Sequence, residues 1–222
     1  MTPTDASTGR LQAFVENRTA PAPVPLAPEI VLLQSDELDG LWRAASHDPV
    51  AWEDSPYWAF AWAGGQALAR FVLDHPETVR GRRVVDFATG SGLLGIAASL
   101  AGAAEVLALD RDPFCEAAVA LNAARNRVHL AFRPGDALGT PLPGCEVLLA
   151  GDVFYQPGLA RAALSWFREL RAGGVRVLAG DACRTYAPCD GFEVLAWYDV
   201  PTTTTIEDAA TKRARVLEIA GP

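Results

Sequence analysis

Acidic residues end two neighbouring apolar runs of the sequence, and a glycine-rich stretch lies between them. Asp86 ends the first run and Asp110 the second, with three glycines in G-x-G-x-x-G spacing between them (Gly90, Gly92 and Gly95). Such a loop lets backbone N–H groups approach a ligand closely. An acid at the tip of the second strand can accept hydrogen bonds from the hydroxyls of a ribose. This spacing therefore indicates the binding of a nucleoside.

Two cofactors fit this layout. The literal glycine pattern, followed by Asp110 at the usual distance, is the fingerprint of an NAD-binding fold. Asp86 argues against NAD, because a carboxylate beside the loop would repel a pyrophosphate and attract a cationic amine. S-adenosylmethionine carries such an amine and a ribose but no phosphate. We therefore predict S-adenosylmethionine as the cofactor and keep an NAD-dependent oxidoreductase as an alternative.

The D-x-x-x-G-x-G arrangement with its second strand-end acid resembles that of class I methyltransferases. The resemblance implies that Asp136, which follows a third predicted strand, meets the adenine amino group. Trp62, on a loop before a predicted helix (65–73), is placed to cover the adenine or the ribose. The full set of predicted cofactor-binding residues is Trp62, Asp86, Ala88, Gly90, Gly92, Asp110, Arg111, Asp136 and Asp152.

The elements that carry these residues alternate between strand and helix. We predict five parallel strands. Two of them end at Asp86 and Asp110, and the other three cover residues 128–132, 145–150 and 175–179. Two later β-prone runs, 192–200 and 214–219, are predicted to form a terminal antiparallel hairpin, as in class I methyltransferases. The predicted fold is α/β and Rossmann-like: a mostly parallel seven-stranded sheet with helices on both faces and a C-terminal antiparallel hairpin.

The first part of the chain is predicted to be an extension. We assign residues 1–50 to an N-terminal extension and 51–222 to the methyltransferase domain. Within the extension we expect a short helix before residue 20, a polyproline-like connector over 20–28, a short strand over 29–33 and a helix over 36–45.

Composition excludes several classes of protein. The net charge of −8 argues against a nucleic-acid-binding protein, which usually carries a basic face. No uninterrupted apolar run reaches transmembrane length, and the first residues lack a signal-peptide pattern. We expect no membrane partner and a cytoplasmic location. The scattered histidines (His47, His75 and His129) show no metal-ligand spacing, so we predict no metal site.

Two further segments resemble one family closely. Residues 58–68, WAFAWAGGQAL, resemble the segment before the core in lysine methyltransferases that modify the β-subunit of electron transfer flavoprotein. Residues 152–155, DVFY, are similar to the acid-x-x-Tyr motif of protein lysine methyltransferases, and the resemblance extends from about Trp52 to the C-terminus. Two loops depart from the pattern. The family's Gly-Asp-Pro-Gly-Arg reads Gly-Asp-Ala-Cys-Arg at 180–184, and the loop between Thr202 and Thr211 does not match the family. We expect both loops to lie near the protein substrate.

The resemblance implies N-methylation of a protein lysine, with electron transfer flavoprotein β-subunit as the expected substrate. Asp152 is predicted to hold the lysine head and Tyr155 to wall its pocket, which makes these two the predicted catalytic residues. The predicted substrate-binding residues are Trp58, Phe154, Asp181 and Arg184. For Trp58, packing in the core is an equally good interpretation. Another protein, such as a ribosomal subunit, or a small amine remains an alternative acceptor.

Overall fold

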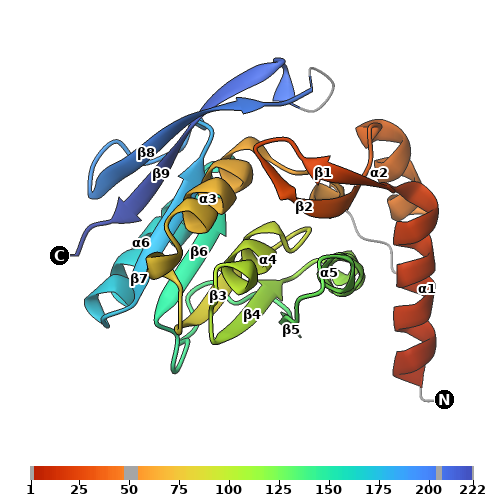
Figure 1. Cartoon of the computed structure of the whole chain (residues 1–222), viewed down its shortest axis with the longest axis horizontal. Helices are drawn as coiled ribbons and strands as arrows, with labels where there is room; N and C mark the ends of the chain where they lie inside the picture. The colour runs from red at the N-terminus through yellow and green to blue at the C-terminus, as the bar shows by residue number, and fades with distance from the viewer. Residues whose placement is uncertain (1–2, 48–54, 204–206, 222) are drawn as a thin grey trace.

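The computed structural model describes residues 3–47, 55–203 and 207–221, and its centre is a mostly parallel β-sheet (Figure 1). The described strands of this sheet lie in the order β5-β4-β3-β6-β7-β9-β8. Their bounds are β3 (Arg83–Phe87), β4 (Glu105–Asp110), β5 (Ala131–Pro134), β6 (Val147–Gly151), β7 (Arg176–Asp181), β8 (Phe192–Pro201) and β9 (Thr211–Ile219). The first five strands of this list run parallel, and β9 is antiparallel to both β7 and β8. The predicted α/β fold with its C-terminal hairpin is confirmed.

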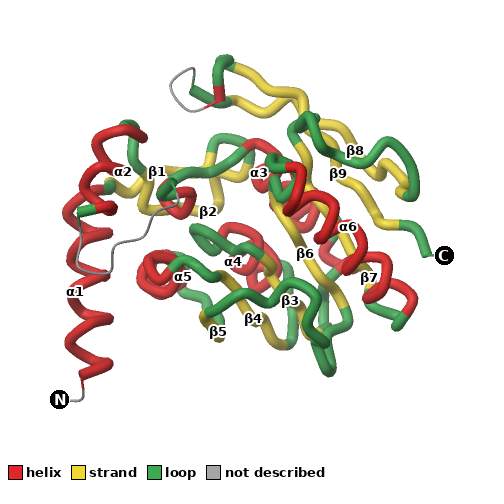
Figure 2. The backbone as a smooth tube through the Cα atoms, turned by 180° about the vertical axis from the view of Figure 1, so that it is seen from behind, coloured by secondary structure: helices red, strands yellow, loops and turns green. Residues whose placement is uncertain are grey.

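Helices cover both faces of the sheet. The helices that follow the N-terminal region are α3 (Ala63–Asp74), α4 (Leu93–Leu100), α5 (Pro113–Arg125) and α6 (Pro157–Ala172), with short 3-10 helices η1 (Tyr57–Ala59) and η2 (Pro76–Thr78). Helices α3 and α4 share one apolar cluster with the sheet, and α6 lies on the opposite face, as Figure 2 shows from behind. Neighbouring strand residues therefore serve different clusters: Val84 packs toward α4, and Val85 packs toward α6. Burial on both faces explains why these strands are continuously apolar.

The N-terminal region forms two helices and a hairpin. Its elements are α1 (Pro3–Arg18), β1 (Ala20–Val24), β2 (Ala27–Gln34) and α2 (Leu38–Ser46). The predicted polyproline-like connector is wrong, because residues 20–24 pair with β2 as an antiparallel strand. Proline lacks an N–H donor, but β1 belongs to a two-stranded sheet and keeps one free edge, where prolines are tolerated.

Two asparagines on α5 attach this hairpin to the rest of the chain. Asn122 Oδ1 accepts a hydrogen bond from the backbone N–H of Leu33 at 2.8 Å, and Asn126 Oδ1 accepts one from Val31 at 2.9 Å. The Nδ2 of Asn126 donates in return to the carbonyl of Val31. The region before residue 48 is therefore bound to α5 through its backbone. The predicted domain boundary, between residues 50 and 51, lies outside the described residues and stays a prediction.

The third predicted strand is displaced along the chain. The sequence predicts a strand over 128–132, whereas β5 covers Ala131–Pro134 and pairs with β4 as far as Asp110. The loop that follows, starting at Gly135, is thereby brought beside the end of β4, where Gly135 N–H donates to the carbonyl of Asp110 at 2.9 Å.

Within the described part of the chain, no helix has both the length and the apolar character needed to cross a membrane.

Candidate functional site

A cavity of about 550 Å³ lies beyond the carboxyl ends of β3, β4 and β6. This is the edge where open parallel sheets bind ligands, and the volume is in the range of small-molecule sites. Eleven of the predicted site residues line it: Trp58, Trp62, Asp86, Ala88, Gly90, Asp110, Arg111, Asp136, Asp152, Tyr155 and Arg184. Residues more than a hundred positions apart in the sequence, such as Trp58 and Arg184, thus line one cavity.

The glycine loop wraps around the carboxylate of Asp86. This side chain is buried, and its Oδ2 accepts hydrogen bonds from Gly95 N–H at 2.8 Å and from the hydroxyl of Thr89. Gly90 has φ +52° and Gly92 φ +85°, a backbone conformation that glycine adopts without steric cost. Gly92 itself is not among the residues that line the cavity; it precedes α4 as the N-cap residue.

The second oxygen of Asp86 has no hydrogen-bond partner among the described residues, although it is buried at the cavity wall. Burial raises the pKa of this carboxyl to about 7, while the hydrogen bonds from Thr89 and Gly95 oppose the rise. A buried acceptor without a partner is costly. A donor group that reached this oxygen, and best a cationic one, would satisfy Asp86.

The acids after the next two strands also lie at the cavity. Asp110 Oδ2 accepts a hydrogen bond from Gly90 N–H at 2.9 Å, and its Oδ1 accepts one from Asp112 N–H at 3.0 Å. Asp136 is exposed, and its Oδ1 accepts the N–H of Leu138 at 2.9 Å. Both carboxylates keep acceptor capacity for a ligand, since each oxygen has two lone pairs.

Aromatic side chains also line the cavity. Trp62 donates its indole N–H to the carbonyl of Tyr57 at 3.0 Å, and the two rings meet edge to face at 5.6 Å. The ring of Tyr57 also meets that of Tyr155 at 5.4 Å. Trp58 is only 1% exposed and stacks on Phe114, so the core interpretation of this residue is the one that the structure supports.

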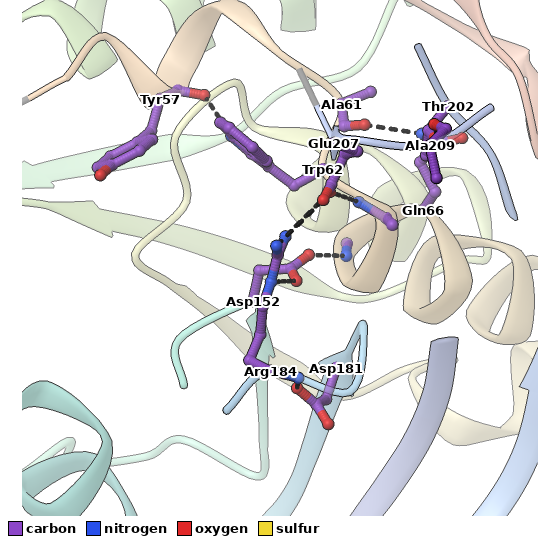
Figure 3. Close-up of polar contacts among 12 residues, drawn as sticks. Tyr57, Ala61, Trp62, Gln66, Asp152, Asp181, Arg184, Thr202, Glu207 and Ala209 are labelled. Atoms are coloured by element: carbon purple, nitrogen blue, oxygen red, sulfur yellow. Dashed lines mark hydrogen bonds and ion pairs between the residues drawn. The ribbon is translucent and has the colours of Figure 1, made fainter. Parts of the chain in front are cut away.

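Asp152 is held in a network of polar contacts at one end of the cavity (Figure 3). Its Oδ2 accepts the N–H of Gly65, in the first turn of α3, at 3.0 Å, and its Oδ1 accepts the Nε–H of Arg184 at 2.9 Å. Burial raises the pKa of this carboxyl, whereas the charge of Arg184 opposes the rise and that of Glu207 adds to it. A carboxylate at this end of a helix is favoured by the helix dipole.

Two predicted substrate contacts are wrong, because neither side chain lines the cavity. Phe154 is fully buried on the α6 side of the sheet, where its ring meets that of Phe167 at 6.5 Å. Asp181 is fully buried too, and its Oδ2 accepts the Nε–H of Arg215 at 3.0 Å. Its Oδ1 accepts the backbone N–H of Arg184 at 3.1 Å, so Asp181 supports the loop that carries Arg184.

Sequence reasoning missed Glu207. This side chain is buried, accepts the N–H of Ala63 at 3.1 Å and accepts both terminal nitrogens of Arg184, at 2.9 and 3.0 Å. It lies more than a hundred residues from Ala63 in a stretch without a recognisable motif. Two signals pointed to this stretch: its position between the strands of the predicted terminal hairpin, and the expectation that the loop between Thr202 and Thr211 lies near the protein substrate.

The sequence of this chain is similar to those of known methyltransferases. A family model described as ribosomal protein L11 methyltransferase (PrmA) matches residues 67–140. The electron transfer flavoprotein beta subunit lysine methyltransferase of Xenopus laevis is 39% identical over 176 residues, which cover 78% of this chain and 70% of that relative.

Solved structures share the fold at low sequence identity. The ribosomal protein L11 methylase of Lactobacillus delbrueckii subsp. bulgaricus has a TM-score of 0.55 at 19% identity, covering 89% of this chain and 98% of that chain. The magnesium protoporphyrin IX methyltransferase of Synechocystis PCC 6803 with bound SAM has a TM-score of 0.52 at 19% identity, covering 71% and 80%. Both are methyltransferases with this type of sheet.

These comparisons give no support to the dinucleotide alternative. The extent and identity of the match to the Xenopus laevis protein exceed what a shared glycine loop alone would produce, because the match spans most of both chains. The chain belongs to the family of electron transfer flavoprotein beta subunit lysine methyltransferases.

Proposed function

We propose that this protein transfers a methyl group from S-adenosylmethionine to the side-chain nitrogen of a lysine in the electron transfer flavoprotein β-subunit. When bound, S-adenosylmethionine supplies an activated methyl group on a sulfonium. The observation that carries the proposal is the position of Asp152, the acid of the DVFY segment, in the same cavity as Asp86 and Asp110. The cavity thus combines groups suited to a nucleoside with a carboxylate suited to an amine.

The residues present fit this donor. The unsatisfied oxygen of Asp86 suits a cationic amine, and Asp110 has the position and the lone pairs to accept ribose hydroxyls. We assign the exocyclic amine of adenine to Asp136 and the apolar cover of the nucleoside to Trp62, because both residues line the cavity. Arg111 also lines the cavity, but a phosphate group would have to lie near the carboxylates of Asp86 and Asp110. Repulsion between like charges therefore favours a phosphate-free nucleoside.

The acceptor end fits an amine. Asp152 lies between the start of α3 and Arg184, with the rings of Trp62 and Tyr155 also lining the cavity. A carboxylate can orient an amine nitrogen, and aromatic walls exclude water from it. For the substrate itself, the support is the substrate for which relatives such as that from Xenopus laevis are named. A ribosomal protein is a second candidate acceptor, favoured by the match of residues 67–140 to the PrmA model. The cytoplasmic location stays a prediction.

The test is a methylation assay with purified acceptors. We expect purified electron transfer flavoprotein β-subunit, mixed with this protein and S-adenosylmethionine, to gain mass in steps of one methyl group at lysine. Ribosomal protein L11 and a set of small primary amines serve as competing acceptors under the same conditions. Methylation of L11 alone would show that a ribosomal protein is the acceptor, and methylation of none of these acceptors would refute the proposal.

Donor affinity is predicted to depend on pH through Asp86. Its pKa is raised to about 7 by burial, so the carboxyl is partly protonated at neutral pH in the free protein. A cationic amine favours the ionised form, so affinity should rise with pH and then level off above that pKa. Below it, we expect the dissociation constant of S-adenosylhomocysteine to increase about tenfold per pH unit. Calorimetry between pH 5.5 and 8.5 measures this, and equal affinities across the range would contradict it.

Asp110→Ala is predicted to weaken the donor without harming the chemical step. The substitution removes the proposed ribose acceptor, and losing a hydrogen bond to a charged group costs about 1.5–3 kcal/mol, or about 10- to 100-fold in affinity. We expect KM for S-adenosylmethionine to rise by that factor, with kcat within a few-fold of the wild-type value. Asp110→Asn is the matched variant, because its amide oxygen can still accept the N–H of Gly90. A fall in kcat with an unchanged KM would contradict the assignment.

A further inference from the structure

Arg184 lies between two buried carboxylates at the acceptor end of the cavity. Its Nε–H donates to Asp152 at 2.9 Å, and its two terminal nitrogens donate to Glu207 at 3.0 and 2.9 Å. The guanidinium carbon is 5.8 Å from the centre of the Trp62 ring. All three charged side chains are largely removed from solvent, with exposed fractions of 21% for Arg184, 8% for Asp152 and 2% for Glu207. The cation is therefore a fixed part of the site.

A lysine acceptor creates a conflict at this place. Only the neutral amine has a free electron pair to attack a methyl group, whereas a carboxylate beside the nitrogen favours the ammonium form. Asp152 alone would thus hold the amine and at the same time keep it protonated. A nearby positive charge has the opposite effect on the amine, and charge effects are strong where water is excluded. Arg184 is the described cation in contact with Asp152.

Resting on the proposed function, we infer that Arg184 is a positioning residue that offsets the charge of Asp152, so that the acceptor lysine is held by a carboxylate and yet is neutral when it attacks. Glu207 holds the guanidinium in place on the side away from Asp152. Asp181 supports the same arginine through its backbone N–H. The contact of Arg184 with Asp152 leaves that oxygen a second lone pair for the substrate nitrogen.

Other ionisable groups of the described residues also lie around the cavity. Asp181, at the end of β7, is paired with Arg215 of β9 at 3.0 Å. Tyr57 and Tyr155 line the wall, and Asp86 and Asp110 lie at the ends of β3 and β4, where the donor is proposed to bind. Among the described residues named here, Arg184 is the cation that contacts Asp152, at 2.9 Å. Its removal should therefore change the protonation of an amine bound there.

The test is the dependence of kcat on pH with the electron transfer flavoprotein β-subunit and S-adenosylmethionine both saturating. Under these conditions the rising limb reports groups in the enzyme–substrate complex. Without the cation the bound lysine should hold its proton more strongly, so in Arg184→Gln the limb should move to higher pH by about 1 unit. Arg184→Lys keeps the charge but loses the planar fork, so its limb should stay near the wild-type position while kcat falls.

Two further variants complete the design. Glu207→Gln removes one negative charge but keeps an oxygen for Ala63 N–H and Arg184, so the rising limb of its kcat profile should move to lower pH. If Arg184→Gln does not fold, this variant alone tests whether the charge balance around Asp152 sets the position of the limb. Arg176→Gln breaks a comparable pair, Arg176 with Glu218 at 2.7 Å, away from the cavity, and should leave the limb unchanged. The inference is overturned if Arg184→Gln leaves the limb in place, if Arg184→Lys moves it equally, or if Glu207→Gln moves it upward or not at all. A wild-type protein that transfers nothing would instead refute the proposed function.

Discussion

Asp152→Asn is expected to lower kcat for methyl transfer by about 100-fold or more while leaving the affinity for S-adenosylhomocysteine within a few-fold of the wild-type value. The charge that holds the acceptor is lost, but the shape of the side chain is kept. Asparagine tolerates the left-handed backbone of this position, φ +53°, better than most residues. Its amide oxygen can still accept the N–H of Gly65, which preserves the start of α3.

The readout separates the two ends of the cavity. Calorimetry with S-adenosylhomocysteine measures the donor end, and single-turnover transfer to the electron transfer flavoprotein β-subunit measures the acceptor end. Asp110→Ala serves as the reciprocal control, since it should weaken the donor and spare kcat. Asp152→Ala should lose as much activity and also some stability, because it leaves the N–H of Gly65 and the guanidinium of Arg184 without their partner. Normal transfer by Asp152→Asn, or loss of donor binding, would refute the role given to Asp152.

The grouping of the acids at the proposed donor end of the cavity could be predicted from the sequence, because these acids lie at the ends of parallel strands. Asp86 lies four residues before Gly90, whereas Asp110 lies 20 residues after it, at the end of the next parallel strand. Because parallel strands place their carboxyl ends at one edge, the order strand, glycine loop, helix and strand was enough to predict that the two acids lie close together. The sequence could not predict which hydrogen bonds each carboxylate already accepts within the protein. Asp86 accepts the N–H of Gly95 and Asp110 accepts the N–H of Gly90, so both also hold the glycine loop.

The acceptor end was harder to predict because long-range contacts form it. Glu207 reaches Ala63 and Arg184 from a part of the chain that has no motif. Phe154 and Asp181 were assigned to the substrate because they lie in motif-like segments, yet neighbouring residues of a strand or turn point in different directions. Burial decides which of them faces the cavity, and burial depends on α6 and on Arg215, which local spacing does not specify.

The prolines of β1 show the same limit in the fold. Residues 20–24 alternate proline with small residues, which favours an extended backbone in isolation. An extended backbone is also what a strand requires, and only the pairing with β2 distinguishes the two. The asparagines of α5 that hold β2 lie about ninety residues away in the sequence. Local propensity predicted the shape of the segment correctly and its partner not at all.

The position of α3 depends on a contact between glycines. The carbonyl oxygen of Gly64 would lie 2.0 Å from a Cβ added at Gly180, and a Cβ at Gly64 would lie 2.6 Å from the carbonyl oxygen of Gly180. Gly151, at the end of β6, would likewise bring a Cβ to 3.0 Å from the Cα of Gly65. The first turn of α3 therefore lies directly on the ends of β6 and β7. This close approach is what brings the N–H of Gly65 to Asp152.

Gly180→Ala is accordingly expected to destabilise the protein by about 3 kcal/mol or more, because the new methyl group meets backbone that cannot rotate away as a side chain could. Urea unfolding measures the change as a lower midpoint. Gly9→Ala is the matched control: nothing lies within 4 Å of a Cβ there, and the exposed position in α1 should gain up to about 1 kcal/mol. Any folded Gly180→Ala protein should also have lost transfer activity, since α3 must move away from Asp152 to admit the methyl group. A midpoint equal to that of the wild-type protein would show that the ends of β6 and β7 do not fix α3.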